Sequence, residues 1–98
     1  MNNGIILSNN QIAQLEQLNS QIAKYPESLE QTIFLFNQIL RTPHMTAWVS
    51  GSDAAKSLEQ RLRGNIQGIH RIIQAIRQIR KTNERLIQMM RENNQTTI

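Results

Sequence analysis

Side chains suited to catalysis or metal binding are few and far apart in this sequence. The two histidines, His44 and His70, have no second histidine or carboxylate at metal-ligand spacing. None of the 98 residues is a cysteine, so a disulfide framework and a thiolate metal site are excluded. There is no glycine-rich phosphate loop and no grouping of Ser, His and Asp that indicates a triad. The sequence therefore predicts a protein that is not an enzyme and that holds no metal and no cofactor.

Positive charge is the second candidate chemistry, and it is unevenly distributed. Up to Gly51 there are two basic and three acidic side chains, whereas nine basic and four acidic ones follow. Basic side chains that alternate with apolar ones are Arg63, Arg71, Arg77, Arg80, Lys81 and Arg85. A nucleic-acid surface would use them to neutralise phosphates, but no recognisable motif or stacking aromatic accompanies them. The solvated face of an amphipathic helix is therefore favoured over nucleic-acid binding.

A lone tryptophan marks the centre of the chain, in the segment Trp48-Val49-Ser50-Gly51. It lies between two long stretches whose apolar residues have helical spacing. A rigid aromatic at a bend between two helices is typical of an interaction module. Trp48 and Gly51 are therefore the first candidate site residues.

The first of the two helices is expected over about 9–41. Ser8-Asn9-Asn10-Gln11 has the form of a capping box at its start. Pro26 lacks a backbone donor, which predicts a kink or break near it, and Thr42-Pro43 ends the arm. The apolar stripe of this arm comprises Leu15, Leu18, Ile22, Tyr25, Leu29, Ile33, Phe36 and Leu40.

The second helix is expected over about 53–92, followed by a flexible tail over 93–98. Its apolar residues recur every 3.5 residues or so, which is typical of coiled-coil packing (about 3.5). Folding the chain back around residue 47 places Gly68 opposite Pro26 and Asn9 opposite Arg85. The glycines at 64 and 68 would then make room for the kink, and the second helix would overhang the first. The stripe expected to form the core or a dimer contact is Leu29, Ile33, Phe36, Leu62, Ile66, Ile69, Ile73 and Ile76.

These elements predict an all-α fold in which residues 1–98 form a single antiparallel helical hairpin with its bend near 43–51. One hairpin leaves an extended apolar stripe partly exposed, so a partner hairpin is expected to complete a four-helix bundle. No apolar run approaches the roughly 20 residues of a membrane span. The first residues lack the basic region, apolar core and cleavage site of a secretory signal peptide.

The layout resembles the WXG (early-secreted-antigen-like) family of small type VII secretion proteins over nearly the whole chain. The features that carry the resemblance are the two helices, Trp48 and Gly51 at the central bend, and the stretch Ala54-Ala55 to Leu58 that opens the second helix. The resemblance implies a hairpin that pairs antiparallel with a like or related chain in a four-helix bundle. It also implies export of the folded protein without a cleaved signal peptide.

The chain departs from the family pattern in ways that indicate a divergent member. Two residues rather than one separate Trp48 from Gly51, and the isoelectric point is near 10.4 although members are often acidic. The family's export signal has an aromatic residue followed four positions later by Asp or Glu, and nothing here fits it. Ile79 and Asn83 keep an apolar residue and an Asn at that spacing. They are the candidates for a degenerate signal, unless a partner chain supplies the signal.

The expected function is that of a type VII secretion substrate, or of a helical escort for a larger secreted toxin, acting by protein–protein binding. Its partners would be itself or a related helical hairpin, a larger toxin and a secretion ATPase. Two alternatives stay open. One is a basic helical hairpin that binds nucleic acid, and the other is a structural coiled-coil subunit of another secretion apparatus. A needle-type subunit would have paired prolines at its turn, where this chain has only Pro43.

Overall fold

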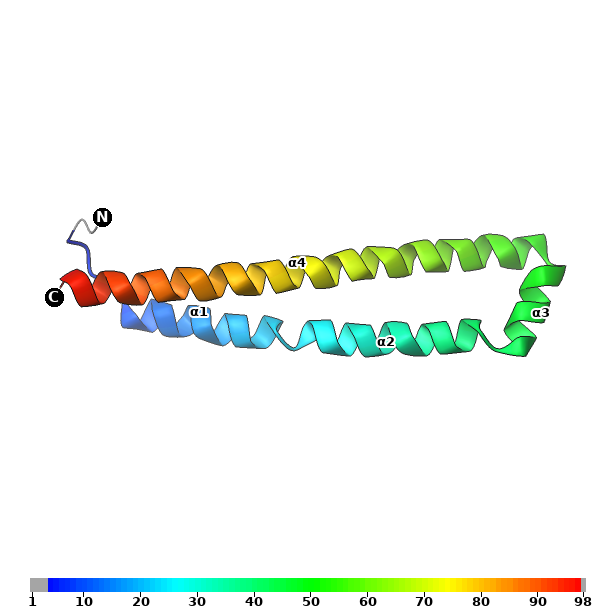
Figure 1. Ribbon diagram of the computed structural model, residues 1–98, viewed down its shortest axis with the longest axis horizontal. Helices are drawn as coiled ribbons and strands as arrows, with labels where there is room; N and C mark the ends of the chain where they lie inside the picture. Colours follow the sequence, from blue (N-terminus) through cyan, green and yellow to red (C-terminus); the bar gives the residue numbers. More distant parts are fainter. Residues whose placement is uncertain (1–3, 98) are drawn as a thin grey trace. The chain divides into compact units, whose positions relative to one another are not determined.

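The computed structural model describes residues 4–97, which form four helices and no strand (Figure 1). The prediction of an all-α fold is confirmed, and the helices pack against one another. The helices are α1 (Asn9–Ile22), α2 (Tyr25–Leu40), α3 (Pro43–Gly51) and α4 (Asp53–Thr97). Their contacts define two compact units. Unit 1 contains the described residues up to Tyr25 and from Ala75 onward, and unit 2 contains Pro26–Gln74.

The arm expected over 9–41, with a kink or break near Pro26, consists of two helices. Ser8 is the N-cap of α1, and its Oγ accepts a hydrogen bond from the Gln11 amide at 3.4 Å. The helix stops at Ile22, and a turn precedes Tyr25. Pro26 then lies in the first turn of α2, where its missing N–H leaves no helical bond unmade. The break directly before Pro26 therefore avoids the cost of a proline inside a helix.

The segment expected as a bend is itself helical. Thr42 is extended, as a residue before proline prefers, and Pro43 opens α3. The hydroxyl groups of Thr46 and Ser50 each donate to the carbonyl four residues earlier, at 3.1 and 2.9 Å. Ser52 is extended and separates α3 from α4. Its Oγ accepts from the Ala55 amide at 3.2 Å and so caps the long helix.

Helix α4 continues past residue 92, where the sequence predicts its end, through Thr97. The flexible tail expected over 93–98 is thus a helical turn as far as Thr97, and Ile98 lies outside the described residues. Asparagine amides hold this turn to the segment before α1. Asn94 donates to the Leu7 carbonyl at 2.9 Å and accepts from the Leu7 amide at 2.8 Å. Asn93 donates to the Ile5 carbonyl at 2.8 Å.

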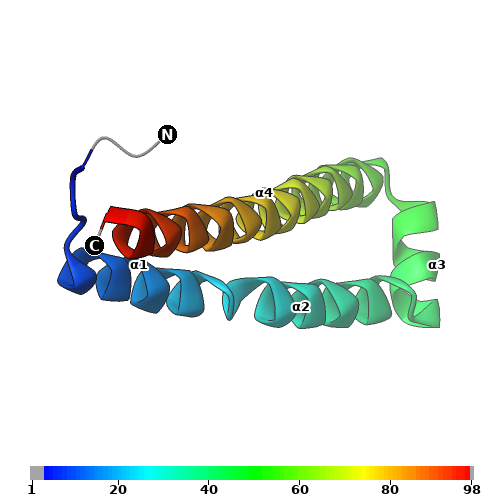
Figure 2. The same ribbon diagram turned by 60° about the vertical axis from the view of Figure 1, so that its left-hand side comes forward.

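Unit 2 has an apolar core between α2 and the first half of α4, which lie side by side (Figure 2). Its buried members are Ile33, Leu40, Ile66 and Ile73, and Leu29, Met45, Leu62 and Ile69 pack against them. Ile73 is 1% exposed and is the most deeply buried large side chain. Close-packed Ile and Leu side chains of this kind supply most of the stability of a small helical unit.

Unit 1 packs α1 against the second half of α4. Ile12 and Ile87 are buried there, and so is the polar side chain of Asn19. Glu16 forms an ion pair with Arg91. The register expected from a fold at residue 47 would place Gln78 beside Glu16, so that register and the overhang it implies are wrong. Helix α3 lengthens the connection between the two arms, and in unit 1 the partner of Glu16 lies nearer the end of α4 than predicted.

The two glycines within α4 do not serve the role predicted for them. An added Cβ at Gly64 or at Gly68 would meet no atom within 4 Å. The expectation that they make room for the kink at Pro26 is therefore wrong. In this chain they are helical positions without a side chain and with open space beside them.

Candidate interaction surface

The tryptophan at the centre of the chain is 56% exposed on α3. Met45 of this helix packs against the apolar core of unit 2, whereas Trp48 does not belong to that core. Gly51 lies three residues further along α3, is exposed, and has open space where a Cβ would be. Its backbone does not have a positive φ, so the fold does not require glycine there. Both residues of the predicted bend motif are therefore accessible, and neither is needed for the packing of unit 2.

The candidate export signal lies on the second half of α4. Ile79 is 46% exposed, and Asn83, one helical turn later, is half-buried. Their role in export stays a prediction.

The predicted core stripe is distributed between core and surface. Leu29, Ile33, Leu62, Ile66, Ile69 and Ile73 all belong to the apolar core of unit 2. Phe36 is 39% exposed, and Leu40, one turn later, is buried more deeply. Ile76 is half-buried in unit 1.

Buried positions recur every seventh residue along the first arm, at Ile12, Asn19, Pro26, Ile33 and Leu40. Positions with the same spacing on α4 include the buried Ile66, Ile73 and Ile87. A seven-residue repeat keeps one side of a helix facing its neighbour. Leu18 and Tyr25, which the sequence places on the inward stripe, each precede a buried residue and are exposed. The other members of the predicted stripe in this arm are half-buried or buried, so the stripe faces inward except at Leu18, Tyr25 and Phe36.

Exposed apolar residues beside the inward stripe form an apolar flank in each unit. In unit 1 this flank consists of Leu18 from α1 and of Ile79, Leu86 and Met89 from α4. In unit 2 it consists of Leu35 and Ile39 from α2 and of Leu58 and Ile72 from α4. Every one of these side chains is at least 46% exposed. The apolar flank is the main feature that the structure adds to the sequence analysis, because periodicity alone does not separate it from the core.

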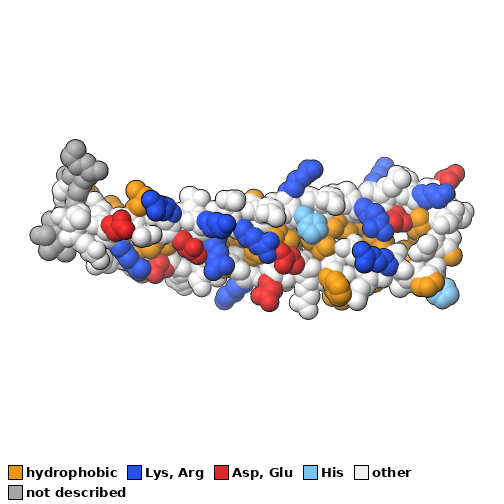
Figure 3. All heavy atoms as spheres, in the orientation of Figure 1, with side chains coloured by type: hydrophobic (Ala, Val, Ile, Leu, Met, Phe, Trp, Pro, Cys, Tyr) orange, Lys and Arg blue, Asp and Glu red, His pale blue; other side chains and the backbone are white. Residues whose placement is uncertain are grey.

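The opposite side of the inward stripe is charged. In unit 1 it carries the pair of Glu16 with Arg91, and Arg80 Nε lies 3.2 Å from Glu84 Oε1. On the first half of α4, Arg63 Nε lies 2.6 Å from Glu59 Oε1. Exposed pairs of this kind contribute little stability, about 0–1 kcal/mol each. Figure 3 shows Lys and Arg side chains scattered over α4 with carboxylates among them.

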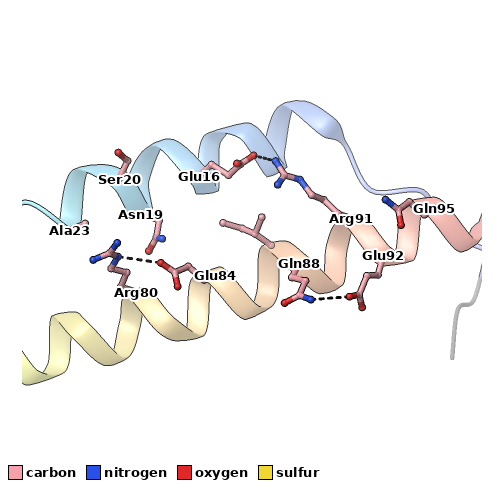
Figure 4. Close-up of a pocket in the computed structure, with 11 residues that line it drawn as sticks. Glu16, Asn19, Ser20, Ala23, Arg80, Glu84, Gln88, Arg91, Glu92 and Gln95 are labelled. Atoms are coloured by element: carbon pink, nitrogen blue, oxygen red, sulfur yellow. Dashed lines mark hydrogen bonds and ion pairs between the residues drawn. The ribbon is translucent and has the colours of Figure 1, made fainter.

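The charged side of unit 1 contains an open groove of about 680 Å³ between α1 and α4 (Figure 4). Its lining residues are Glu16, Asn19, Ser20, Ala23, Arg80, Glu84, Ile87, Gln88, Arg91, Glu92 and Gln95. Asn19 is 8% exposed and points from α1 toward the part of α4 that carries Arg80 and Glu84. Its Oδ1 is buried and accepts no hydrogen bond within the described structure. A buried acceptor without a donor costs about 1–3 kcal/mol, so this atom is the least satisfied polar group of the groove.

Among residues 4–97 no group of three or more His, Asp or Glu side chains is arranged to hold a metal ion. None of the helices over the same residues is long and apolar enough to cross a membrane. Comparison of the chain with family models, with curated proteins and with solved structures found no match. The candidate site is thus the apolar flank, together with the exposed tryptophan on α3.

Proposed function

We propose that this protein acts by pairing its apolar flank with a second helical hairpin, either its own copy or a related chain, in a four-helix bundle. In this role it is a small type VII secretion substrate, or a helical escort for a larger secreted toxin. It leaves the cell without a cleaved signal peptide, and it makes contact with a secretion ATPase on the way. The single observation that carries the pairing is the exposure of apolar residues on one side of the inward stripe in each unit.

The apolar flank has the composition of a helix-packing surface. In unit 1, the small residues Ala75 and Thr82 alternate with Ile79 and Leu86 along α4. Small residues beside large ones allow two helices to approach closely and to interdigitate. Because these side chains are already about half buried, covering the rest of each contributes roughly half of the about 1.5–3 kcal/mol of full burial, before the costs of association. A partner hairpin covers such a surface along its length, whereas a small ligand would leave most of it in water.

The tryptophan supports the secretion role. Trp48 is more than half exposed and is not a member of the apolar core of unit 2. Its ring is therefore available as an amphipathic anchor for another protein. Gly51 is not required by the backbone of α3, so its presence is consistent with a close approach from outside. These two residues are also the ones that carry the resemblance to the WXG family. Export therefore accounts for two exposed residues that the fold itself does not need.

Sedimentation equilibrium tests the pairing. We expect a dimer at micromolar concentration, and we expect Ile79→Glu to shift it toward monomer by at least about tenfold in Kd, because a carboxylate would have to be buried. Gln78→Glu adds the same charge one residue away, outside the apolar flank, and is expected to leave the dimer intact. A well-folded wild-type monomer would exclude pairing with itself, and co-purification with a related hairpin from the native cell would then decide the remaining case.

Export is tested in the native cell. We expect the protein in the culture medium when the membrane-bound secretion ATPase is present, and only inside the cell when its gene is deleted. A cytoplasmic enzyme measured in the same fractions controls for lysis. Equal amounts in the medium with and without the ATPase would contradict the secretion role while leaving the pairing untouched.

A further inference from the structure

The α4 part of the apolar flank in unit 1 has a regular spacing of its own. Ala75, Ile79, Thr82, Leu86 and Met89 follow one another at alternating steps of four and three residues, and all five are exposed. This is the spacing of a coiled-coil seam. We call these five residues the outer seam, because they lie beside the inward stripe that packs on α1. Helix α4 therefore has one seam for its own hairpin and a second one that fits another helix.

Helix α1 has no seam that matches the outer seam. Leu18 is the apolar residue that α1 contributes to the flank. The exposed residues that continue from it at steps of three and four are Gln11, Gln14 and Gln21. Apolar side chains buried against these amides would leave the amides without hydrogen-bond partners, which is costly. In a second copy of the chain, the helix that suits the outer seam is therefore α4 itself.

Side-chain size in the outer seam favours an antiparallel pair of α4 helices. Ala75 and Thr82 are small, whereas Ile79 and Leu86 are large. In an antiparallel pair centred between residues 79 and 82, Ile79 lies opposite Thr82 of the second copy and Leu86 lies opposite its Ala75. Each layer then contains one large and one small side chain, which packs evenly. A parallel pair would place every residue opposite itself, so crowded layers would alternate with underfilled ones.

Charges at the edge of the outer seam favour the same register. Arg85 directly precedes the seam residue Leu86. In the register centred between residues 79 and 82, Arg85 faces the uncharged Gln78 of the second copy, and Arg71 faces its Glu92. A shift of one heptad would place Arg85 opposite Arg85 of the second copy in one direction and opposite Arg71 in the other. Like charges at such edge positions disfavour a pairing.

Larger shifts lose the match of size. Two heptads in one direction would place Leu86 opposite Arg61 of the second copy, and two heptads in the other direction would place it opposite Met89. The first layer would bury a guanidinium group, and the second would crowd two large side chains. Size and charge together therefore select one register.

We propose that the partner of this hairpin is a second copy of the chain, and that the two α4 helices meet antiparallel along the outer seam, with Ile79 opposite Thr82 and Ala75 opposite Leu86. This inference rests on the proposed pairing of the apolar flank. It adds the identity of the partner, the helix in contact and the register. In each copy α1 stays packed on its own α4, so the contact requires no change in the fold of unit 1.

Disulfide cross-linking tests the register, because the natural chain contains no cysteine. Full-length Ala75→Cys labelled with ¹⁵N is mixed with unlabelled Leu86→Cys at micromolar concentration and oxidised, and intact masses distinguish the products. The two copies of residue 75 would be separated by about 11 residues of helical rise, roughly 16 Å, whereas a disulfide needs Cα atoms within about 7 Å. We therefore expect the heterodisulfide to exceed each homodisulfide at least about fivefold.

Three further mixtures distinguish the alternative registers. Ile79→Cys with Thr82→Cys should also form a heterodisulfide, because these residues face each other in the proposed contact. Ala75→Cys with Ile79→Cys, and Thr82→Cys with Leu86→Cys, correspond to shifts of one heptad and should form little. Sedimentation and circular dichroism of each reduced variant verify that it is folded and still a dimer.

A size exchange tests the same contact without cysteines. Ala75→Leu is expected to raise the Kd of self-association at least about tenfold, because the new side chain crowds Leu86 of the second copy. Leu86→Ala in the same chain makes room for it, so the double variant should recover most of the lost affinity. Ala13→Leu makes the same change at an exposed position of α1 outside the flank and should leave the Kd unchanged.

Three results would overturn the proposed contact. They are a dimer whose homodisulfides at residue 75 or 86 match the heterodisulfide, a main product from one of the shifted mixtures, and a double variant that pairs no better than Ala75→Leu. Each would leave the pairing of the apolar flank in place and refute only the α4 contact. A well-folded wild-type monomer would refute the α4 contact together with the pairing of the chain with itself.

Discussion

Unit 2 and unit 1 each pack one helix of the first arm against α4, but they fill the contact with different chemistry. The buried side chains of unit 2 that form its cluster are all Ile or Leu. Unit 1 buries Ile12 and Ile87 together with the amide of Asn19, and it adds amide hydrogen bonds from Asn94 to the backbone of Leu7. The helices of unit 2 are held together by apolar packing. Those of unit 1 are held together by a smaller apolar core and by polar groups within and beside it.

This difference suggests that unit 2 supplies stability and that unit 1 supplies selectivity for particular partners and registers. Apolar burial contributes about 25 cal/mol per Å² whichever neighbour is present, whereas a buried amide is satisfied only by particular partners. Unit 2 is therefore expected to supply most of the free energy of unfolding. Unit 1 is expected to open at lower free energy and to distinguish among registers and partners.

The largest effect on the free energy of unfolding should come from truncating a side chain in the core of unit 2. Ile73→Ala is expected to lower the free energy of unfolding by about 3–4 kcal/mol, because the residue is 1% exposed and its truncation leaves a closed cavity. Ile87→Ala in unit 1 should cost about half as much, since that side chain borders the open groove. Urea unfolding followed by circular dichroism measures both, with Gln74→Ala as the control. Equal losses at the two isoleucines would remove the distinction between the units.

The second effect has the opposite sign. Asn19→Leu is expected to raise the free energy of unfolding by about 1–2 kcal/mol, because it removes a buried acceptor without a donor and adds apolar burial. Asn65→Leu makes the same change at an exposed position of α4 and should be nearly neutral. Urea unfolding of both variants gives the comparison. A clear loss of stability in Asn19→Leu would mean that the amide is satisfied within unit 1.

The third effect concerns α4 within unit 2. Gly64→Ala and Gly68→Ala should each raise the free energy of unfolding by about 0.5–1 kcal/mol, because the new methyl group meets nothing and the helix gains propensity. Thermal unfolding of the single and double variants tests this, and the two gains should add. A loss at either position would show that an unseen contact fills the space beside it.

The smallest effect on stability belongs to α3. Trp48→Ala is expected to change the free energy of unfolding by no more than about 0.5 kcal/mol, because the ring is 56% exposed and lies outside the core cluster. Secretion into the medium should nevertheless fall strongly if the tryptophan is a docking anchor. Both quantities are measured on the same variant, with Thr46→Ala on the same helix as the control. A large fall in melting temperature with a proportional fall in secretion would instead make Trp48 a part of the core.

The helical nature of the chain and the positions of its breaks were predictable, because they follow from local chemistry. Ser8 caps α1, Pro26 opens α2 and Pro43 opens α3, each through bonds that involve only neighbouring residues. Most of the core of unit 2 was predictable as well, since its Ile and Leu residues share one helical face. The fate of 43–51 was not predicted, because a bend and a short helix are both compatible with Pro43 and the residues that follow it.

At the margin of the inward face, the spacing did not identify which residues are buried. The prediction took Leu18 and Tyr25 as inward residues, whereas the structure buries Asn19 and Pro26, one residue later in each case. A buried asparagine inside a heptad repeat has no local signature that distinguishes it from a surface one. The groove, which depends on that burial, was therefore missed.

The amide contacts of unit 1 join residues that are remote in the sequence, and this has a consequence for the order in which the chain folds. Leu7 and Asn94 are 87 residues apart, whereas unit 2 is a single continuous segment of the chain. Closing a short loop costs less entropy than closing a long one, so unit 2 is expected to form first during synthesis and to shorten the remaining loop. Until Arg91 and Asn94 have emerged from the ribosome, Ile12 and Asn19 have no helix to pack on. Throughout that interval α1 is open to a chaperone or to a partner that is being translated nearby.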